Sequence, residues 1–190
     1  MRKLIAGMKL SLDGMAYGAE DMADWVDAWS EDYGLTPEID ACLLGAGMYP
    51  GYEHYWTAIR ADPATPQWIR ETPPTAAEVA WAELVPHMPH YVLSHGLNDT
   101  GWSNVTFLRS LADVAALKQQ AGKGIYLVGG PRLTAELIEA GLVDEIRLIL
   151  YPLIAGAGRP LFAESSRRAL RLLDSKALGD GRVMLTYASG

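Results

Sequence analysis

Short apolar runs alternate with segments of helical spacing along most of the chain. Runs of strand length are bounded by glycine or proline, and the segments between them repeat apolar residues at the helical period. The predicted strands are Lys3–Leu12, Ile39–Leu44, His90–Ser94, Val105–Phe107, Ile125–Val128 and Asp144–Ile154. The predicted helices are Glu20–Tyr33, Tyr52–Ala61, Ala76–Leu84, Asp113–Gln120 and one that begins at Pro131 and is capped by Gly141.

The end of the chain follows another pattern. Leu170–Ala177 and Arg182–Ala188 read as strands joined by Gly179–Gly181, without a helix between them. This order predicts an α/β fold: a mostly parallel, mixed central sheet with helices on both faces and an antiparallel C-terminal strand pair. The length of 190 residues suits one core, and no repeat or linker divides it, so residues 1–190 are expected to form a single domain.

Charge and composition narrow the function classes. A net charge of −7 and a pI near 5.0 argue against nucleic acid or an anionic membrane as the main partner. The single cysteine, Cys42, excludes an internal disulfide and a cysteine-rich metal site. His87 and His90 have ligand-like spacing but no third partner, so no metal is expected. No signal peptide or membrane-length apolar run is visible, which favours a cytoplasmic protein.

One stretch carries the clearest chemical signal. In IYLVGGPRLTAEL the predicted strand ends at Val128, and Gly129, Gly130 and Pro131 lead directly into a helix. The first N–H groups of a helix have no partners within it, and the helix dipole is positive at that end. Glycine also lets an anion approach the backbone closely. The stretch is therefore a candidate phosphate seat, and the alternative is a plain turn that needs glycine for its dihedral angles.

Two further strand ends are expected at the same edge of the sheet. Gly45–Met48 follows the second predicted strand, and Ser94-His95 follows the third. Because ligands bind outside the carboxyl ends of parallel strands, the three turns together predict a long, phosphate-bearing ligand such as a dinucleotide. The spacing Gly45-x-Gly47-x-x-x-Gly51 differs from the Rossmann fingerprint, since its third glycine comes one residue late.

The predicted first helix supplies the candidate substrate side. Trp25 and Trp29 share a helix face, and Tyr17 precedes them. Asp24 or Asp27, placed among these rings, would have a raised pKa and act as a proton donor. The alternative is a solvated acidic helix face.

These motifs resemble the dihydrofolate reductase superfamily, in the branch that contains the reductase domain of the riboflavin-pathway deaminase-reductase. The resemblance is carried by SLDG at Ser11–Gly14, LLG at Leu43–Gly45, YVLS at Tyr91–Ser94 and the long block Tyr126–Phe162. It implies a three-layer dihydrofolate reductase-like fold, a homodimer and an NADPH-dependent reductase. It also implies that Gly129-Gly130 lies against the cofactor pyrophosphate, often with a cis peptide. The cofactor-binding residues that it implies are Gly45, Ala46, Gly47, Met48, Ser94, His95, Val128, Gly129, Gly130, Pro131, Arg132 and Leu133.

The chain departs from its relatives after the second strand. Many of them have Gly-Arg-x-Thr where this chain has Gly45-Ala46-Gly47-Met48. The arginine that meets the 2′-phosphate is therefore missing, so NADH is possible beside NADPH unless His95 or Arg132 compensates. No basic cluster in the early chain supplies contacts for a ribityl or ribosyl phosphate. The expected activity is hydride transfer to a small heterocyclic, pterin- or pyrimidine-like, or carbonyl substrate. The alternative is a non-catalytic dimeric module that binds a small molecule or nucleotide.

Overall fold

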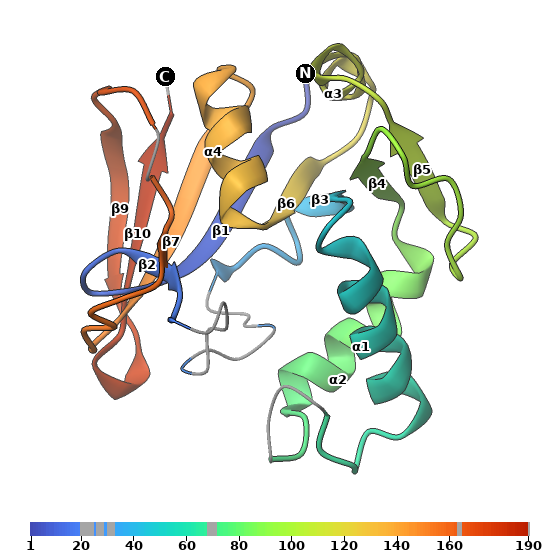
Figure 1. Ribbon diagram of the computed structural model, residues 1–190, viewed down its shortest axis with the longest axis horizontal. Helices are drawn as coiled ribbons and strands as arrows, with labels where there is room; N and C mark the ends of the chain where they lie inside the picture. The colour runs from blue at the N-terminus through green and yellow to red at the C-terminus, as the bar shows by residue number, and fades with distance from the viewer. Residues whose placement is uncertain (20–24, 26–28, 30–32, 68–71, 163–164, 190) are drawn as a thin grey trace.

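An eight-stranded sheet forms the centre of the computed structural model, which describes residues 1–19, 25, 29, 33–67, 72–162 and 165–189. The strand order is β5 (Val105–Leu108), β4 (His90–Leu93), β3 (Ile39–Gly45), β6 (Gly124–Gly129), β1 (Leu4–Ser11), β7 (Glu145–Tyr151), β10 (Val183–Ala188) and β9 (Arg171–Ala177). Neighbouring strands from β5 to β7 pair in parallel, whereas β10 runs antiparallel to both β7 and β9. The predicted mixed sheet and its antiparallel C-terminal pair are confirmed (Figure 1).

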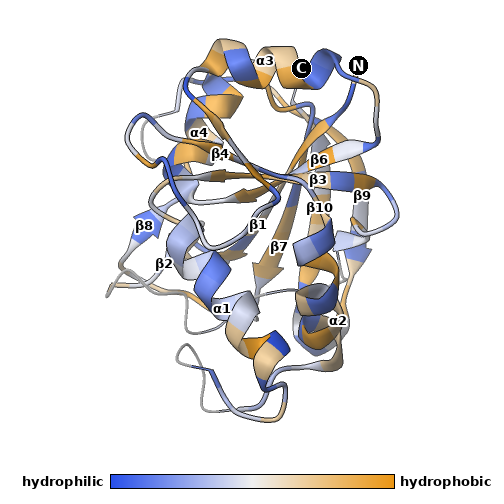
Figure 2. Ribbon diagram, turned by 90° about the vertical axis from the view of Figure 1, so that its right-hand side faces the viewer, coloured by the Kyte–Doolittle hydropathy of each residue, from blue (hydrophilic) through white to orange (hydrophobic). Residues whose placement is uncertain are grey.

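Helices cover both faces of this sheet, as the alternation of elements predicts. They are α1 (Tyr49–Ala61), α2 (Ala76–Leu84), α3 (Leu111–Gln119) and α4 (Pro131–Glu139). Along β1, Ile5 belongs to the hydrophobic core under α1 and α2, whereas Leu4 and Ala6 belong to the core under α3 and α4. Successive side chains of a strand point to opposite faces, so one strand contributes to both cores. Figure 2 shows the hydrophobic strands between the two helical layers.

The two cores differ in composition. The core under α1 and α2 is rich in aromatic rings, and at its centre Trp29 stacks on Trp81 with ring centroids 3.6 Å apart. Tyr126 meets Trp29 edge-on at 5.5 Å. Such stacked and edge-on pairs add roughly 0.5–1.5 kcal/mol each beyond the area that they bury. The opposite core is mainly aliphatic, with Leu43, Leu127, Leu137, Ile146 and Val143 among its members.

One predicted helix starts earlier in the structure, and another lies largely outside the described residues. Helix α1 begins at Tyr49, three residues before the predicted start, because Pro50 fits the first turn, where a backbone N–H needs no partner. The predicted helix Glu20–Tyr33 falls largely outside the described residues, with Trp25, Trp29 and Tyr33 as the described positions within it. None of the described helices has the length and apolar character needed to cross a membrane.

A small second sheet was not predicted. Strand β2 (Met15–Tyr17) pairs antiparallel with β8 (Arg159–Pro160), which joins the segment after β1 to the segment after β7. Gly158 makes this contact possible, because a β-carbon there would lie 1.9 Å from the carbonyl oxygen of Tyr17. Strands of three and two residues are too short to show an alternation of apolar and polar positions, so the sequence pattern does not reveal β2 and β8.

A buried ion cluster ties β7 to the chain before β3. The Arg147 guanidinium donates to Glu145 at 2.7 Å, to Glu38 at 2.8 Å and to the carbonyl oxygen of Tyr33 at 2.5 Å. Arg147 and Glu145 are 8% and 5% exposed. Lys3 reaches Glu145 at 3.2 Å from the solvent side. The cluster therefore holds residues 33–38 against strand β7.

Candidate functional site

Three strand ends meet at one edge of the sheet, as predicted. Strands β4, β3 and β6 are neighbours, and their register places Gly45 beside Leu93 and Leu44 beside Gly129. The Ala46 N–H donates to the Leu93 carbonyl oxygen at 3.2 Å, which joins the first two turns. A β-carbon at Gly45 would lie 3.4 Å from Leu133 Cδ2, so the first turn also packs against α4. The turns at Gly45–Met48, Ser94-His95 and Gly129-Gly130 thus form one continuous rim.

The helices that begin at this rim differ from the other two. Helices α2 and α3 each carry a complete capping box, built on Thr75 with Glu78 and on Ser110 with Asp113. Helices α1 and α4 have no side-chain cap from the described residues, and their first turns carry no acidic residue. Both begin with a proline in the first turn. Two helix N-termini with unpaired N–H groups therefore face the rim, and that is the arrangement an anionic ligand needs.

The Gly129-Gly130 turn depends on backbone angles that favour glycine. Their φ angles are +113° and +85°, and a β-carbon at Gly129 would lie 3.1 Å from Met8 Sδ. At Gly130 a β-carbon would meet nothing within 4 Å, so the backbone is open there. The resemblance suggested a cis peptide at this pair, but the described residues contain none. Two successive positive φ angles turn the chain without one. Val128 is half-buried, Pro131 is buried and Arg132 is exposed.

The turn after β4 is held by an arginine that sequence reasoning missed. Ser94 is buried, and its hydroxyl oxygen accepts hydrogen bonds from the N–H groups of Gly96 and Leu97. Arg109 Nη1 donates to the carbonyl oxygens of Ser94 at 2.7 Å and Leu97 at 2.9 Å. Arg109 directly follows β5, and the only hint of its role in the sequence is that it is a single cation at the end of a predicted strand. His95 is exposed in the same turn.

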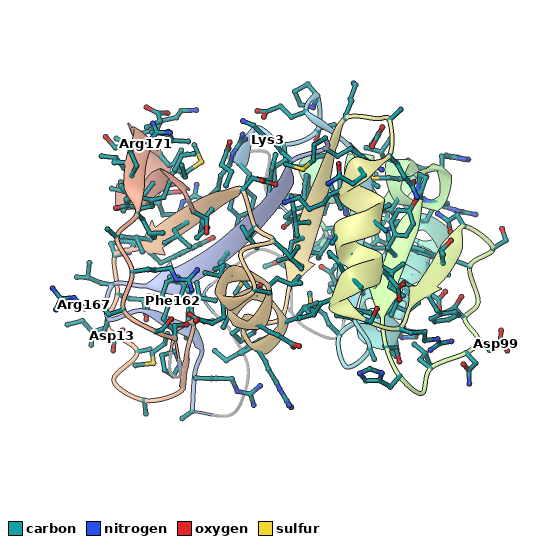
Figure 3. The ribbon with its side chains drawn as sticks, turned by 90° about the horizontal axis from the view of Figure 1, so that it is seen from above. Lys3, Asp13, Asp99, Phe162, Arg167 and Arg171 are labelled. Carbon is teal, nitrogen blue, oxygen red and sulfur yellow. The ribbon has the colours of Figure 1, made fainter. Side chains whose placement is uncertain are left out.

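The other end of the site is a cavity of about 400 Å³ lined by Gly18, Ala19, Trp25, Leu153 and Ala155. Trp25, predicted to line the substrate side, thus forms one wall. Its indole Nε1–H is buried and has no acceptor among the residues that the structure describes. Buried N–H donors in folded proteins nearly always have a hydrogen-bond acceptor, so a ligand atom or a water molecule is expected beside this indole. Figure 3 shows the molecule from above, with Asp13 close to this end and Asp99, from the loop after β4, at the opposite side.

The remaining predicted substrate-side residues are placed differently. Trp29 is 3% exposed and lies in the aromatic core, which leaves little of its ring for a ligand. Tyr17 belongs to β2, where the guanidinium of Arg159 lies 5.6 Å from the centre of its ring. Asp24 and Asp27 lie outside the described residues, so their role as proton donors stays a prediction.

No group of three potential ligands that could hold a metal ion occurs among the described His, Cys, Asp and Glu residues. His90, whose spacing from His87 looked ligand-like, has both ring nitrogens in contact with other groups. Its Nδ1 lies 2.7 Å from the Met88 carbonyl oxygen and its Nε2 lies 3.3 Å from the Tyr52 hydroxyl. Burial lowers the pKa of His90 to about 4, so the ring is neutral at pH 7. His90 is a core residue.

A carboxylate clamp joins the two loops that line the cavity. Asp13 accepts a hydrogen bond from the Ser11 hydroxyl at 2.5 Å and from the N–H groups of Ala155 and Gly156 at 3.0 and 2.9 Å. These bonds, led by that from Ser11, lower the pKa of Asp13 to about 2. Asp13 thus fixes the loop that carries Leu153 and Ala155 against the β1–β2 segment.

Asp13→Asn is therefore expected to lower the melting temperature at pH 7, because an amide offers one acceptor oxygen where the carboxylate offers two. The folded-state pKa lies below its ordinary value of 3.8, so the contribution is complete above that pH and is lost as the pH falls toward 2. Thermal melts between pH 7 and pH 3 check this, and the wild-type advantage should shrink at the acid end. Asp174→Asn on exposed β9 makes the same charge change and serves as control. A difference that does not vary with pH would contradict the clamp.

Comparisons with known proteins agree with this geometry. The family model of the RibD C-terminal domain matches residues 2–184. The uncharacterized protein YyaP of Bacillus subtilis is 31% identical over 98% of this chain and 94% of its own length. Dihydrofolate reductase from Enterococcus faecalis, solved with NADP(H), superposes with a TM-score of 0.63 at 16% identity over 98% of this chain and 95% of that one. The Thermotoga maritima diaminohydroxyphosphoribosylaminopyrimidine deaminase/5-amino-6-(5-phosphoribosylamino)uracil reductase gives a TM-score of 0.63 at 12% identity over 98% of this chain and 56% of that one.

Proposed function

The chain belongs to the RibD C-terminal domain family, and on that premise we propose that it is a reductase that transfers hydride from NADPH to a small heterocyclic, pterin- or pyrimidine-like, or carbonyl substrate. The observation that carries the proposal is the pair of uncapped helix N-termini, α1 and α4, beside each other at the rim. Composition and the family resemblance extend the proposal to a cytoplasmic homodimer that uses neither nucleic acid nor a membrane.

The residues of the rim fit a dinucleotide. The backbone N–H groups at the start of α1 and α4 are donors for phosphate oxygens, and Gly130 leaves room for a pyrophosphate to lie against the chain. NADPH, when bound, supplies the hydride, and the protein holds and orients it. The turns at Gly45–Met48, Ser94-His95 and Val128–Leu133 would hold the cofactor, while the cavity beside Trp25 would hold the substrate ring.

Positive charge near the rim favours NADPH over NADH. Ala46 and Met48 offer no cation, but Arg132 is exposed in the first turn of α4, and Arg109 is fixed against the turn after β4 by three hydrogen bonds. A guanidinium pairs with a phosphate through two parallel N–H donors, whereas it binds the uncharged 2′-hydroxyl group of NADH more weakly. The 2′-phosphate of NADPH would therefore be recognised from these two residues and His95 rather than from the turn after β3.

NADPH is expected to stabilise the protein more than NADH does. At a hundred times its dissociation constant a ligand adds about 2.7 kcal/mol to the free energy of unfolding. For a chain of this size that corresponds to a rise of roughly 5–10 °C in melting temperature. Thermal melts with each cofactor at equal concentration measure the effect, and the failure of both to raise the melting temperature at millimolar concentration would refute the cofactor assignment.

A non-catalytic binding module is the second candidate, favoured by the apolar Ala46 and Met48. The two functions differ in turnover. Loss of NADPH absorbance with a panel of pterins, ribosylaminopyrimidines and carbonyl compounds supports the reductase. Cofactor binding without oxidation by any of them supports the module.

A further inference from the structure

The described residues that line the cavity beside Trp25 carry no charge. Its lining residues come from the segment after β2 and from the loop after β7, and none of the five carries an ionisable side chain. Its volume of about 400 Å³ suits one or two fused rings. This places an uncharged wall where the proposed substrate would lie.

The chain around the first wall carries negative charge alone. Residues 10–53, which supply Gly18, Ala19 and Trp25, contain no Lys, Arg or His. Their acidic residues are Asp13, Glu20, Asp21, Asp24, Asp27, Glu31, Asp32, Glu38, Asp40 and Glu53. Whichever of these side chains face the cavity, none brings a positive charge to it.

The cations Lys9, Arg159 and Arg182 stand on neighbouring elements, and none of them is among the described residues that line the cavity. Lys9 on β1 already has a partner within the chain, and the Arg159 guanidinium lies over the Tyr17 ring. The Arg182 guanidinium lies over the ring of Tyr151, the last residue of β7. Residues 152–158, which supply the second wall, contain neither a cation nor an anion. Arg109 and Arg132 instead belong to the rim of the sheet, where the cofactor is proposed to lie.

A phosphate group is disfavoured in such surroundings. Leaving water costs an ionised group several kcal/mol unless cations or N–H donors replace its hydration, as order-of-magnitude transfer energies indicate. The Asp13 carboxylate, which accepts a hydrogen bond from the Ala155 N–H of the second wall, adds repulsion that weakens as salt is raised. We infer that the substrate of this chain is a neutral or cationic ring compound without a phosphate group. The inference rests on the proposed reductase function, and it separates this site from the Thermotoga maritima protein, which is named for a phosphoribosyl compound.

Two matched pairs of ligands test the inference: 5-amino-6-ribosylaminouracil with its 5′-phosphate, and neopterin with its phosphate. Calorimetric titration into protein saturated with NADP⁺, the oxidised cofactor, which has no hydride to transfer, gives their dissociation constants without turnover. At least one neutral member is expected to bind about tenfold or more tightly than its phosphate ester at low salt, with a smaller ratio at high salt.

Variants at Ala19, an exposed residue of the cavity wall, separate charge from size. Ala19→Lys should improve binding of the phosphate ester roughly tenfold by placing one opposite charge near it. Ala19→Met, of similar length and without charge, should not.

Three outcomes would overturn the inference. The wild type binds the phosphate esters as tightly as the neutral compounds, or it binds neither neutral compound, or Ala19→Lys leaves the preference unchanged. The NADPH-induced rise in melting temperature is measured on cofactor-free portions of the same samples. If NADPH still raises the melting temperature in these samples, the inferred substrate class is wrong but the proposed cofactor assignment is not affected.

Discussion

Gly130→Ala is expected to weaken NADPH binding by at least about tenfold, or roughly 1.4 kcal/mol, while the protein still folds. Gly130 lies between β6 and the uncapped start of α4, with φ at +85° and open space where a β-carbon would stand. A methyl group there costs about 1–3 kcal/mol of backbone strain. It also occupies the space through which a pyrophosphate would reach the first N–H groups of the helix.

Gly141→Ala is the matched control for this effect. Gly141 follows the other end of the same helix, has a φ of +67° and is equally open. Its substitution adds strain of similar kind without touching the rim. Urea unfolding gives the loss of stability in each variant, and calorimetric titration gives the dissociation constant for NADPH. Equal cofactor affinity in the two variants would remove Gly130 from the cofactor site.

Arg147→Met is expected to destabilise the fold by about 3–5 kcal/mol, because it leaves the buried Glu145 carboxylate without its main partner. The same change removes the donor to the Tyr33 carbonyl oxygen and the contact with Glu38. For a chain of this length the melting temperature should fall by roughly 6–20 °C. Urea denaturation measures the free energy of unfolding directly.

Lys3→Met removes the exposed cation of the same cluster and serves as control. Lys3 is 64% exposed at its side chain and meets the same Glu145 carboxylate from solvent. An ion pair of this kind contributes about 0–1 kcal/mol. Similar losses in both variants would show that burial of the Arg147–Glu145 pair adds nothing to its strength.

Much of the architecture was readable from periodicity and turn residues. Helix α2 has the predicted bounds Ala76–Leu84, because Thr75 and Glu78 form a capping box that fixes its first turn. The buried strands β3 and β6 were recognisable as apolar runs that end in glycine. These signals are local, so a single sequence reveals them. The family resemblance, carried by Tyr126–Phe162, is confirmed as well.

What escaped prediction depends on contacts between distant segments. The β2–β8 pairing is decided by Gly158 lying against Tyr17, which are far apart in the chain. Arg109 lies at the rim because it donates hydrogen bonds to the carbonyl oxygens of Ser94 and Leu97, and the sequence pattern does not show which carbonyl groups a side chain will reach. Trp29 was assigned to the substrate side because helical spacing tells which residues share a face but not what that face meets. Its partner, Trp81, comes from α2.

The unequal composition of the two cores has a consequence for spectroscopy. All the tryptophans that the structure describes, at positions 25, 29, 56, 81 and 102, belong to the aromatic core or pack against it, whereas the aliphatic core contains none of them. The fluorescence of these five tryptophans therefore reports loosening on the α1–α2 side of the sheet and responds little to the α3–α4 side. Partial unfolding of helix α4 would leave the emission of these five tryptophans nearly unchanged and would appear in circular dichroism, so coincidence of the two signals is a strict test of all-or-none unfolding for this chain.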